Sequence, residues 1–508
     1  MRITLVYQGR YHLREALDLE TLAAILRAQG HHVSFIYHPN VFGITDNVFQ
    51  CAPLSRFLSN EKRIQDRILS SRPDALIFSV LAQTHEWCHT LAESLKQRIW
   101  VPIIFTGLYP SLTPERGMER DAVDYIIQGE VEDVILPLLE SLDKGKDPVN
   151  VGNLWYRRDN APVFTHRQPL VNLDNLPLPD KELFFPHISH AYSYSAMVSR
   201  GCPFHCSFCE ETCMKKVCGS GYFRRKRVDT ILMELEEGKQ RYGFREVIFK
   251  DSYLSGDRAW LSKLMEGYAR RIGVPFKCFC TVTAFDRETA SLLKEGGCYS
   301  VEFGLQTWNE TLRREVLNRK ESNEDALRAF GYCREMGLWY DVDHMFDLPK
   351  ETARDHLDGA RRYAQLPHLG RIKVHHLVYL PTAEIVRHGQ QSGDLPFDIP
   401  NPLSVEHACD FYQPRQGIRS NENNTSDFAA LYKILPLLPQ GLLEWFLRKR
   451  RVQWLSRMPA IFMASLQGAN ALRCGDLRFL AYLHFYPRKV LMSLLLRHGF
   501  LRSRTNQP

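Results

Sequence analysis

Residues 199–209, SRGCPFHCSFC, are the most informative stretch of the sequence. They place Cys202, Cys206 and Cys209 on one short loop, directly after an apolar segment that predicts a strand. Three thiolates can hold three irons of a [4Fe-4S] cluster and leave the fourth iron open to another ligand. The spacing therefore predicts an open iron–sulfur site. A structural zinc site is the alternative, because zinc takes four ligands there and Cys213, Cys218 or His205 could supply the fourth.

The region around this loop alternates strands and helices. Residues 191–385 contain six strand-like segments separated by helical segments, which predicts a partial (β/α)6 TIM-type barrel with its chemistry at the carboxyl ends of the strands. The six segments are AMVSRG (196–201), EVIFKD (246–251), FKCFCTV (276–282), YSVEFGL (299–305), YDVDHMF (340–346) and KVHHLVYL (373–380).

The flanking regions predict three further parts. Residues 1–150 alternate short apolar runs with amphipathic helices, which favours an α/β, doubly wound, Rossmann-like (flavodoxin-like) domain that binds ligands beyond its strand ends. Residues 151–190 end in a proline-rich stretch that predicts a linker. Residues 386–508 have no strand signal and predict an α-helical C-terminal region.

Composition and charge exclude several classes of protein. The 508 residues are 44% hydrophobic and 24% charged, which argues against disordered and fibrous chains. The net charge of +7 is concentrated at the end: residues 441–508 carry 12 Lys and Arg against two acidic residues, whereas the rest carries 53 basic and 56 acidic residues. The basic segment interleaves Trp, Phe and Leu. It is typical of amphipathic helices that contact an anionic membrane surface or an acidic partner. A helical cap on the barrel is the alternative, and no nucleic-acid partner is expected.

The start of the chain and the cysteine count indicate a compartment. MRITLVYQGR predicts a first strand, not a signal peptide. Thirteen cysteines without an export signal favour reduced thiols. We expect a cytoplasmic protein, with membrane-surface association if the basic segment provides it. Cys278, Cys280 and Cys298 are interpreted as core thiols, with a second cluster as the alternative.

The cysteine loop resembles that of the radical S-adenosylmethionine (radical SAM) superfamily, including an aromatic residue, Phe208, just before the last cysteine. The resemblance implies a [4Fe-4S] cluster on Cys202, Cys206 and Cys209. It also implies S-adenosyl-L-methionine on the open iron, and a 5′-deoxyadenosyl radical that attacks the substrate.

The same resemblance assigns residues to the S-adenosylmethionine site. It implies that Phe208 packs near the adenine and that Asp251, Gln306 and Pro349 line the site. MFDLPKET (345–352) resembles the family's Gly-Leu-Pro-Gly-Glu-Thr turn, but Asp347 and Lys350 replace both glycines. The family's backbone contact at this turn is therefore not expected here. Ordinary strand-end caps are the alternative for Asp251, Gln306 and Asp347.

The N-terminal domain resembles the cobalamin-binding module of the cobalamin-dependent radical SAM enzymes. The segments that carry this resemblance follow three strands and imply cobalamin contacts from Ser79, Leu81, Thr106, Gly107, Gln128, Gly129 and Glu130. The family's Asp-x-His-x-x-Gly signature is absent from YQGRYHLREA (7–16). Cobalamin is therefore expected without a protein histidine on the cobalt, and His12 is interpreted as a surface or capping residue. The alternative is a nucleotide-type fold without a ligand.

Together these features predict a radical SAM enzyme with cobalamin that acts on an unactivated carbon, by methyl transfer in the resembled subclass. Radical cyclisation or rearrangement without methyl transfer is one alternative, and a non-catalytic iron–sulfur docking protein is another. The expected partners are a small-molecule, lipid or peptide substrate and an electron donor such as flavodoxin or ferredoxin.

Overall fold

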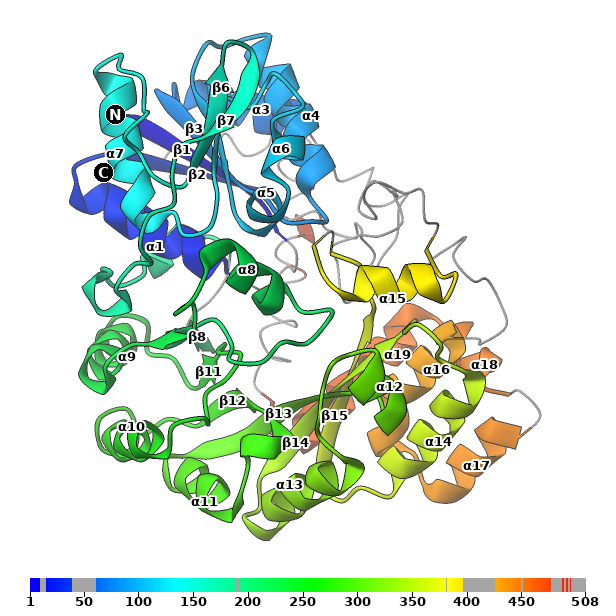
Figure 1. The fold of residues 1–508 in the computed structure, drawn as a ribbon. Helices are drawn as coiled ribbons and strands as arrows, with labels where there is room; N and C mark the ends of the chain where they lie inside the picture. Colours follow the sequence, from blue (N-terminus) through cyan, green and yellow to red (C-terminus); the bar gives the residue numbers. More distant parts are fainter. Residues whose placement is uncertain are drawn as a thin grey trace. The chain divides into compact units, whose positions relative to one another are not determined.

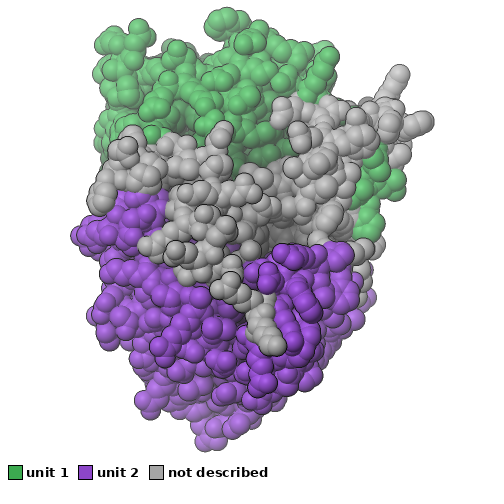
Figure 2. Space-filling view, turned by 90° about the vertical axis from the view of Figure 1, so that its right-hand side faces the viewer, with its two compact units in different colours: residues 1–189, 480–508 green, residues 190–479 purple. Residues whose placement is uncertain are grey.

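The computed structural model describes residues 1–9, 15–38, 61–187, 192–380, 382–395, 425–448 and 451–476, with four single residues between 487 and 494. The chain divides into two compact units (Figure 2). The first comprises residues 1–189 and 480–508, and the second comprises residues 190–479.

The first unit is built on one sheet with the strand order β2-β1-β3-β4-β5-β6-β7. Its first five strands are parallel, as the alternation of strands and helices predicts. They are β2 (His32–His38), β1 (Arg2–Gln8), β3 (Ala75–Ser79), β4 (Ile103–Thr106) and β5 (Tyr125–Ile127). Helices α1 (Leu17–Ala28) and α7 (Glu132–Asp143) cover one face, and α3 (Glu61–Ser70) and α4 (His85–Lys96) cover the other (Figure 1). The doubly wound prediction is confirmed.

The expected linker begins as a β-hairpin. Strands β6 (Leu154–Arg158) and β7 (Ala161–Phe164) are antiparallel and extend the sheet beyond β5. Asp159 and Asn160 both have positive φ, 51° and 62°. These are the dihedrals of a two-residue hairpin turn, for which Asp and Asn are suited. The interpretation of this stretch as a plain linker is therefore wrong for residues 154–164.

The second unit contains six parallel strands in chain order, β8-β11-β12-β13-β14-β15. They are β8 (Tyr194–Ala196), β11 (Val247–Phe249), β12 (Phe276–Cys280), β13 (Cys298–Gln306), β14 (Trp339–Phe346) and β15 (Leu369–His376). The connecting helices lie outside the curved sheet (Figure 1); they are α9 (Val228–Tyr242), α10 (Arg258–Arg271), α11 (Arg287–Glu295), α13 (Asn323–Glu335) and α14 (Ala353–Ala364). This is the predicted partial barrel.

The C-terminal helices of the described chain belong to the barrel core. They are α16 (Thr425–Ile434), α17 (Gln440–Leu447), α18 (Gln453–Ser456) and α19 (Ala460–Arg473). Phe428, Tyr432, Leu443 and Leu455 are buried in the same hydrophobic cluster as the barrel strands. The described residues 425–448 and 451–476 therefore form a helical cap on the barrel, as in the alternative interpretation, whereas most of residues 477–508 lie outside the described residues. Within the described residues, no helix is both long enough and apolar enough to span a membrane.

Candidate functional site

The cysteine loop lies between β9 (Ser199–Arg200) and α8 (Glu210–Cys218), with Cys209 at the helix N-cap position. The loop after α12 (Glu310–Glu315) holds it in place. Ser207 donates its hydroxyl to the carbonyl of Val316 (2.5 Å) and its backbone N–H to that of Leu317 (3.0 Å). Phe208 is half-buried in the turn before Cys209. The loop conformation is thus fixed by a segment more than a hundred residues away.

The three thiols of this loop have raised pKa values because they are buried. Burial raises the pKa of Cys202 to about 11 and that of Cys209 well above its usual value. Metal binding offsets this cost, because a coordinated thiol is deprotonated. Among the described residues, these thiols do not form a set of ligand atoms within 4.8 Å of one another.

Arg319 joins the cysteine loop to strand β13. Its Nη1 lies 3.6 Å from Cys206 Sγ, and its Nη2 donates to the carbonyl of Gly304 (2.6 Å). Its Nε pairs with Glu321, which is also buried. The sequence interpretation missed Arg319, because no spacing rule relates it to the cysteines.

Asp251 lies just beyond β11 and holds the residues that lead into the cysteine loop. Its Oδ1 accepts the backbone N–H groups of Val198 (2.9 Å) and Ser199 (2.5 Å) and the hydroxyl of Ser199 (2.6 Å). Its Oδ2 is buried and has no hydrogen-bond partner. Burial raises the pKa of Asp251 to about 6, against the hydrogen bonds from Ser199. One oxygen therefore orients the loop and the other is available to a bound donor.

Gln306 ends β13 in an unusual conformation. Its φ is 69°, at a register irregularity between β13 and β14. Its Oε1 is buried without a hydrogen-bond partner. A positive φ is rare for a residue with a side chain and is often found at functional sites. The amide oxygen, like Asp251 Oδ2, can accept a hydrogen bond from a ligand.

Pro349 is buried in the turn between β14 and α14, where two residues adopt the conformation of glycine. Asp347 and Lys350 have φ of 64° and 65°. The backbone thus adopts the left-handed conformation at the two positions where the family pattern has glycine. Replacing the glycines has not removed this backbone conformation from the turn. Asp347 Oδ2 lies 2.6 Å from His376 Nδ1, so its side chain also pairs with β15.

The inner face of the barrel carries charges that the sequence interpretation did not single out. Residues 301, 303 and 305 of β13 pack in the hydrophobic core, so the alternating residues face the other way. Lys277 pairs with Asp341, and Lys373 pairs with Glu302. Burial lowers the pKa of Lys373 to about 7. The sequence indicates this charged face through charged residues at every second position of β14 and β15.

The remaining cysteines of the barrel lie where the sequence predicts. Cys278, Cys280 and Cys298 are buried in the hydrophobic core of the second unit. Hydrogen bonds with the Cys280 and Cys298 thiols, together with burial, raise the pKa of Cys278 well above its usual value. All three are thus core residues, as the sequence predicts.

In the first unit, the predicted cobalamin residues follow three adjacent parallel strands. Ser79 ends β3, Thr106 ends β4, and Gln128 follows β5. Gly107 and Gly129 have φ of 105° and 93°. A Cβ on Gly107 would lie 2.9 Å from the carbonyl oxygen of Val80. The absence of a side chain at Gly107 thus lets the segment after β4 pass close to the backbone of Val80 at this edge.

Some of these side chains are already engaged within the unit. Gln128 donates to the carbonyl of Ser111 (2.9 Å) and accepts from Trp155 Nε1 (3.0 Å). Glu130 accepts the backbone N–H of Val171 (2.9 Å). Leu81 is half-buried just after β3. His12 lies outside the described residues.

Two family models match the chain, one for each unit. Residues 197–361 match the Radical SAM superfamily, and residues 11–139 match the B12 binding domain. The fold and the cysteine loop thus define a radical SAM protein. The chain thus carries both a radical SAM domain and a B12 binding domain, and the cofactors that follow from these two domains are a [4Fe-4S] cluster, S-adenosylmethionine and cobalamin.

Relatives and a solved structure agree with this assignment. An uncharacterized methyltransferase of Pyrococcus horikoshii is 23% identical over 54% of this chain and 60% of its own length. An anaerobic magnesium-protoporphyrin IX monomethyl ester cyclase of Rubrivivax gelatinosus is 22% identical over 61% of this chain and 57% of its own. The cobalamin-dependent S-adenosylmethionine radical enzyme OxsB, solved with aqua-cobalamin, has a TM-score of 0.65 at 15% identity, over 98% of this chain and 76% of its own. The chain spans less than two thirds of the length of these two curated relatives.

Proposed function

We propose that this protein transfers a methyl group to an unactivated carbon of its substrate. The observation that carries the proposal is the open three-cysteine loop at the carboxyl ends of the barrel strands, in a chain that also has a B12 binding domain. The name of the Pyrococcus horikoshii relative supports methyl transfer. When bound, the cluster and S-adenosylmethionine supply hydrogen-atom abstraction, and cobalamin supplies the carriage of the methyl group.

The residues of the second unit would bind and orient the cofactors. Cys202, Cys206 and Cys209 would hold three irons. Asp251 Oδ2 would accept a hydrogen bond from the amino group of S-adenosylmethionine, and Gln306 Oε1 would accept from a ribose hydroxyl, because both oxygens are buried without a partner.

Two apolar residues complete the S-adenosylmethionine site in this proposal. Phe208 would pack near the adenine ring, and the buried Pro349 would line the site from the turn after β14. Both lie on segments fixed by backbone hydrogen bonds, Phe208 between Ser207 and Cys209 and Pro349 between Leu348 and Glu351. The site is thus preorganised by the barrel.

In the first unit, the strand-end residues would contact cobalamin. Ser79, Thr106 and Gly107 offer small side chains and backbone groups at adjacent strand ends. The side-chain amide of Gln128 is occupied by Ser111 and Trp155, and the backbone N–H groups of Gln128 and Gly129 donate to Asn153 and Ser111. The proposed contribution of both residues is therefore through their backbone carbonyl groups. Leu81 and Glu130 complete the proposed set.

The inner face of the barrel favours a substrate with polar or charged groups. His375 lies 3.4 Å from Asp343, and both side chains are partly exposed, as is that of Arg371. A charged lining selects against a purely hydrocarbon substrate, because covering these ion pairs with apolar groups would remove their hydration. We therefore propose a small molecule in preference to a lipid or a peptide, with reducing electrons from a flavodoxin or ferredoxin.

The C-terminal helices expose aromatic side chains that could contact a hydrophobic substrate or a membrane surface. The side chains of Trp445, Trp454 and Phe462 are 39%, 51% and 47% exposed. Arg451 lies 4.3 Å above the ring of Trp445. Exposed aromatic and cationic side chains together are typical of interfacial helices. This part of the proposal concerns delivery of the substrate and is secondary to methyl transfer.

Radical cyclisation remains the second candidate, favoured by the name of the Rubrivivax gelatinosus relative. Comparing the metabolites of cells that make the intact chain with those of cells that make a Cys202→Ala variant separates the two. A product heavier than its precursor by one methylene supports methyl transfer. A product lighter by two hydrogens favours cyclisation, and identical metabolites in both cells contradict both.

A further inference from the structure

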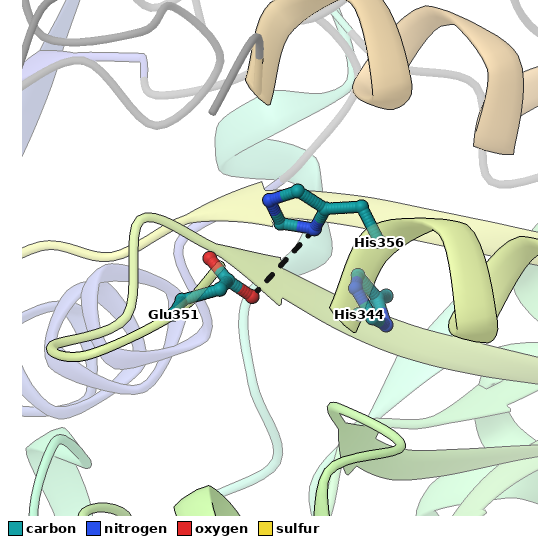
Figure 3. Close-up of side chains that lie close together, drawn as sticks. All are labelled: His344, Glu351 and His356. Atoms are coloured by element: carbon teal, nitrogen blue, oxygen red, sulfur yellow. Dashed lines mark ion pairs between the residues drawn. The ribbon is translucent and has the colours of Figure 1, made fainter. Parts of the chain in front are cut away.

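A second cluster of ligand-type side chains lies outside the cysteine loop. His344 on β14, Glu351 in the following turn and His356 on α14 each present an atom within 4.8 Å of the other two (Figure 3). All three residues are buried, and His356 has no exposed surface. Among the described residues, no other set of three His, Cys, Asp or Glu residues meets this distance.

The hydrogen bonds of this cluster are incomplete. Both ring nitrogens of His356 and the Nε2 of His344 are buried without a hydrogen-bond partner. His356 Nδ1 lies 3.8 Å from Glu351 Oε1. That separation is too long for a hydrogen bond. Buried polar atoms are nearly always satisfied, so three such nitrogens in one place require an explanation.

The rings that surround these imidazoles are mostly aromatic. Aromatic rings pack against them: Phe346 and Phe428 lie 4.9 and 5.2 Å from His356, and Tyr432 lies 4.7 Å from His344. The Tyr432 hydroxyl is engaged with the carbonyl of His356. A phenylalanine would suit either position better than an unpaired imidazole.

The geometry matches the requirements of a metal ion. Two imidazoles and one carboxylate form a known donor set for Zn²⁺, with bonds of about 2.0–2.2 Å, which places ligand atoms about 3.3 Å apart around a tetrahedral ion. The 3.8 Å between His356 and Glu351 is close to that value. His344 Nδ1 lies 3.1 Å from the hydroxyl of Tyr363, which leaves Nε2 as the ligand atom. Such outer hydrogen bonds orient metal-binding histidines.

We propose that His344, Glu351 and His356 bind a divalent transition-metal ion, for which zinc is the suitable probe. A water molecule would take the fourth position. The ion would tie β14 to α14 across the turn that contains Pro349, and so stabilise the wall of the S-adenosylmethionine site. The inference does not depend on the activity proposed above.

Metal analysis of the full-length chain tests this site. Wild-type protein with a reconstituted cluster, supplied with zinc and then dialysed, is expected to hold one zinc per chain besides cluster iron. His344→Phe and His356→Phe are expected to hold less than a tenth of that. His89→Phe is the matched control, because His89 is also buried with an unpartnered nitrogen but has no such neighbours; it should retain the zinc.

Two further measurements keep the test independent of variant folding and of the cluster. X-ray absorption at the zinc edge of the wild type is expected to show only nitrogen and oxygen ligands. A Cys202→Ser/Cys206→Ser/Cys209→Ser variant is expected to keep one equivalent of a transition metal, and a chelator should lower its Tm. Wild type without zinc, zinc with sulfur ligands, or an unchanged zinc content in His356→Phe would each overturn the proposal.

Discussion

Arg319 places one guanidinium nitrogen, Nη1, 3.6 Å from the sulfur of Cys206. The other two guanidinium nitrogens donate to the carbonyl of Gly304 and to the carboxylate of Glu321. The positive charge is mostly shielded from solvent and lies beside a proposed cluster ligand. Charges and hydrogen bonds near the cysteine sulfurs set the reduction potential of an iron–sulfur cluster. A cation favours the reduced, more negative state.

The first prediction follows from this contact. Arg319→Gln should lower the midpoint potential of the cluster and slow its reduction, whereas Arg319→Lys should keep most of the wild-type potential. Redox titration followed by electron paramagnetic resonance measures the change. Iron content serves as the control for cluster assembly. Equal potentials in wild type and Arg319→Gln would show that Arg319 only supports the loop.

Asp251 predicts a pH dependence of cofactor binding. Its pKa is about 6 because of burial, so the carboxyl is ionised above that pH and protonated below it. The ionised form is the better acceptor for an ammonium group. The affinity for S-adenosylmethionine should therefore be constant above pH 7 and weaken toward pH 5.5.

The matching variant for this prediction is Asp251→Asn. It should bind S-adenosylmethionine more weakly at every pH, and its affinity should lose the step near pH 6. Equilibrium binding to the reconstituted protein across this range provides the Kd values. A flat profile in the wild type would remove Asp251 from the proposed site.

Lys350 is predicted to be a strained position. It is exposed and has φ of 65°, a conformation that costs a residue with a side chain about 1–2 kcal/mol. Lys350→Gly should raise the free energy of unfolding by about 0.5–1 kcal/mol, because glycine adopts this conformation at little steric cost. Lys350→Val should lower it. Thermal unfolding checks both, and a stability loss in Lys350→Gly would mean that the lysine side chain makes a compensating contact.

Gly107 is predicted to be required for cobalamin binding. A Cβ there would meet Val80 O at 2.9 Å and Val80 N at 3.0 Å. Gly107→Ala should therefore reduce corrinoid retention at least tenfold while the iron content stays unchanged. Gly145→Ala is a suitable control, since Gly145 also has positive φ but nothing within 4 Å. Normal corrinoid absorbance in Gly107→Ala would contradict the proposed edge.

The sequence predicts those parts of the structure whose residues lie close together along the chain. The cysteine loop shows its three cysteines within eight residues, and each barrel strand shows as an apolar run of its own. Arg319 has no such signal, because its contact with Cys206 spans 113 positions of the chain. Its role depends on how the barrel brings the end of β13 to the loop.

Other features were visible in the sequence but admitted a commoner interpretation. Asp159 and Asn160 are a hairpin signal that the nearby prolines obscured. His344 and His356 occupy apolar positions of a strand and a helix, where a single histidine is usually a core residue. The left-handed conformations of Asp347 and Lys350 follow from the turn geometry, which residue type alone does not reveal.

Reductive cleavage of S-adenosylmethionine tests the central claim most directly. The reconstituted chain, supplied anaerobically with cobalamin, a reductant and S-adenosylmethionine, should form 5′-deoxyadenosine, measured by liquid chromatography with mass spectrometry. The Cys202→Ser/Cys206→Ser/Cys209→Ser variant should form none above the protein-free background. Equal amounts of 5′-deoxyadenosine from the two proteins, or none from a wild type with a full cluster, would contradict the assignment of this chain as a radical enzyme.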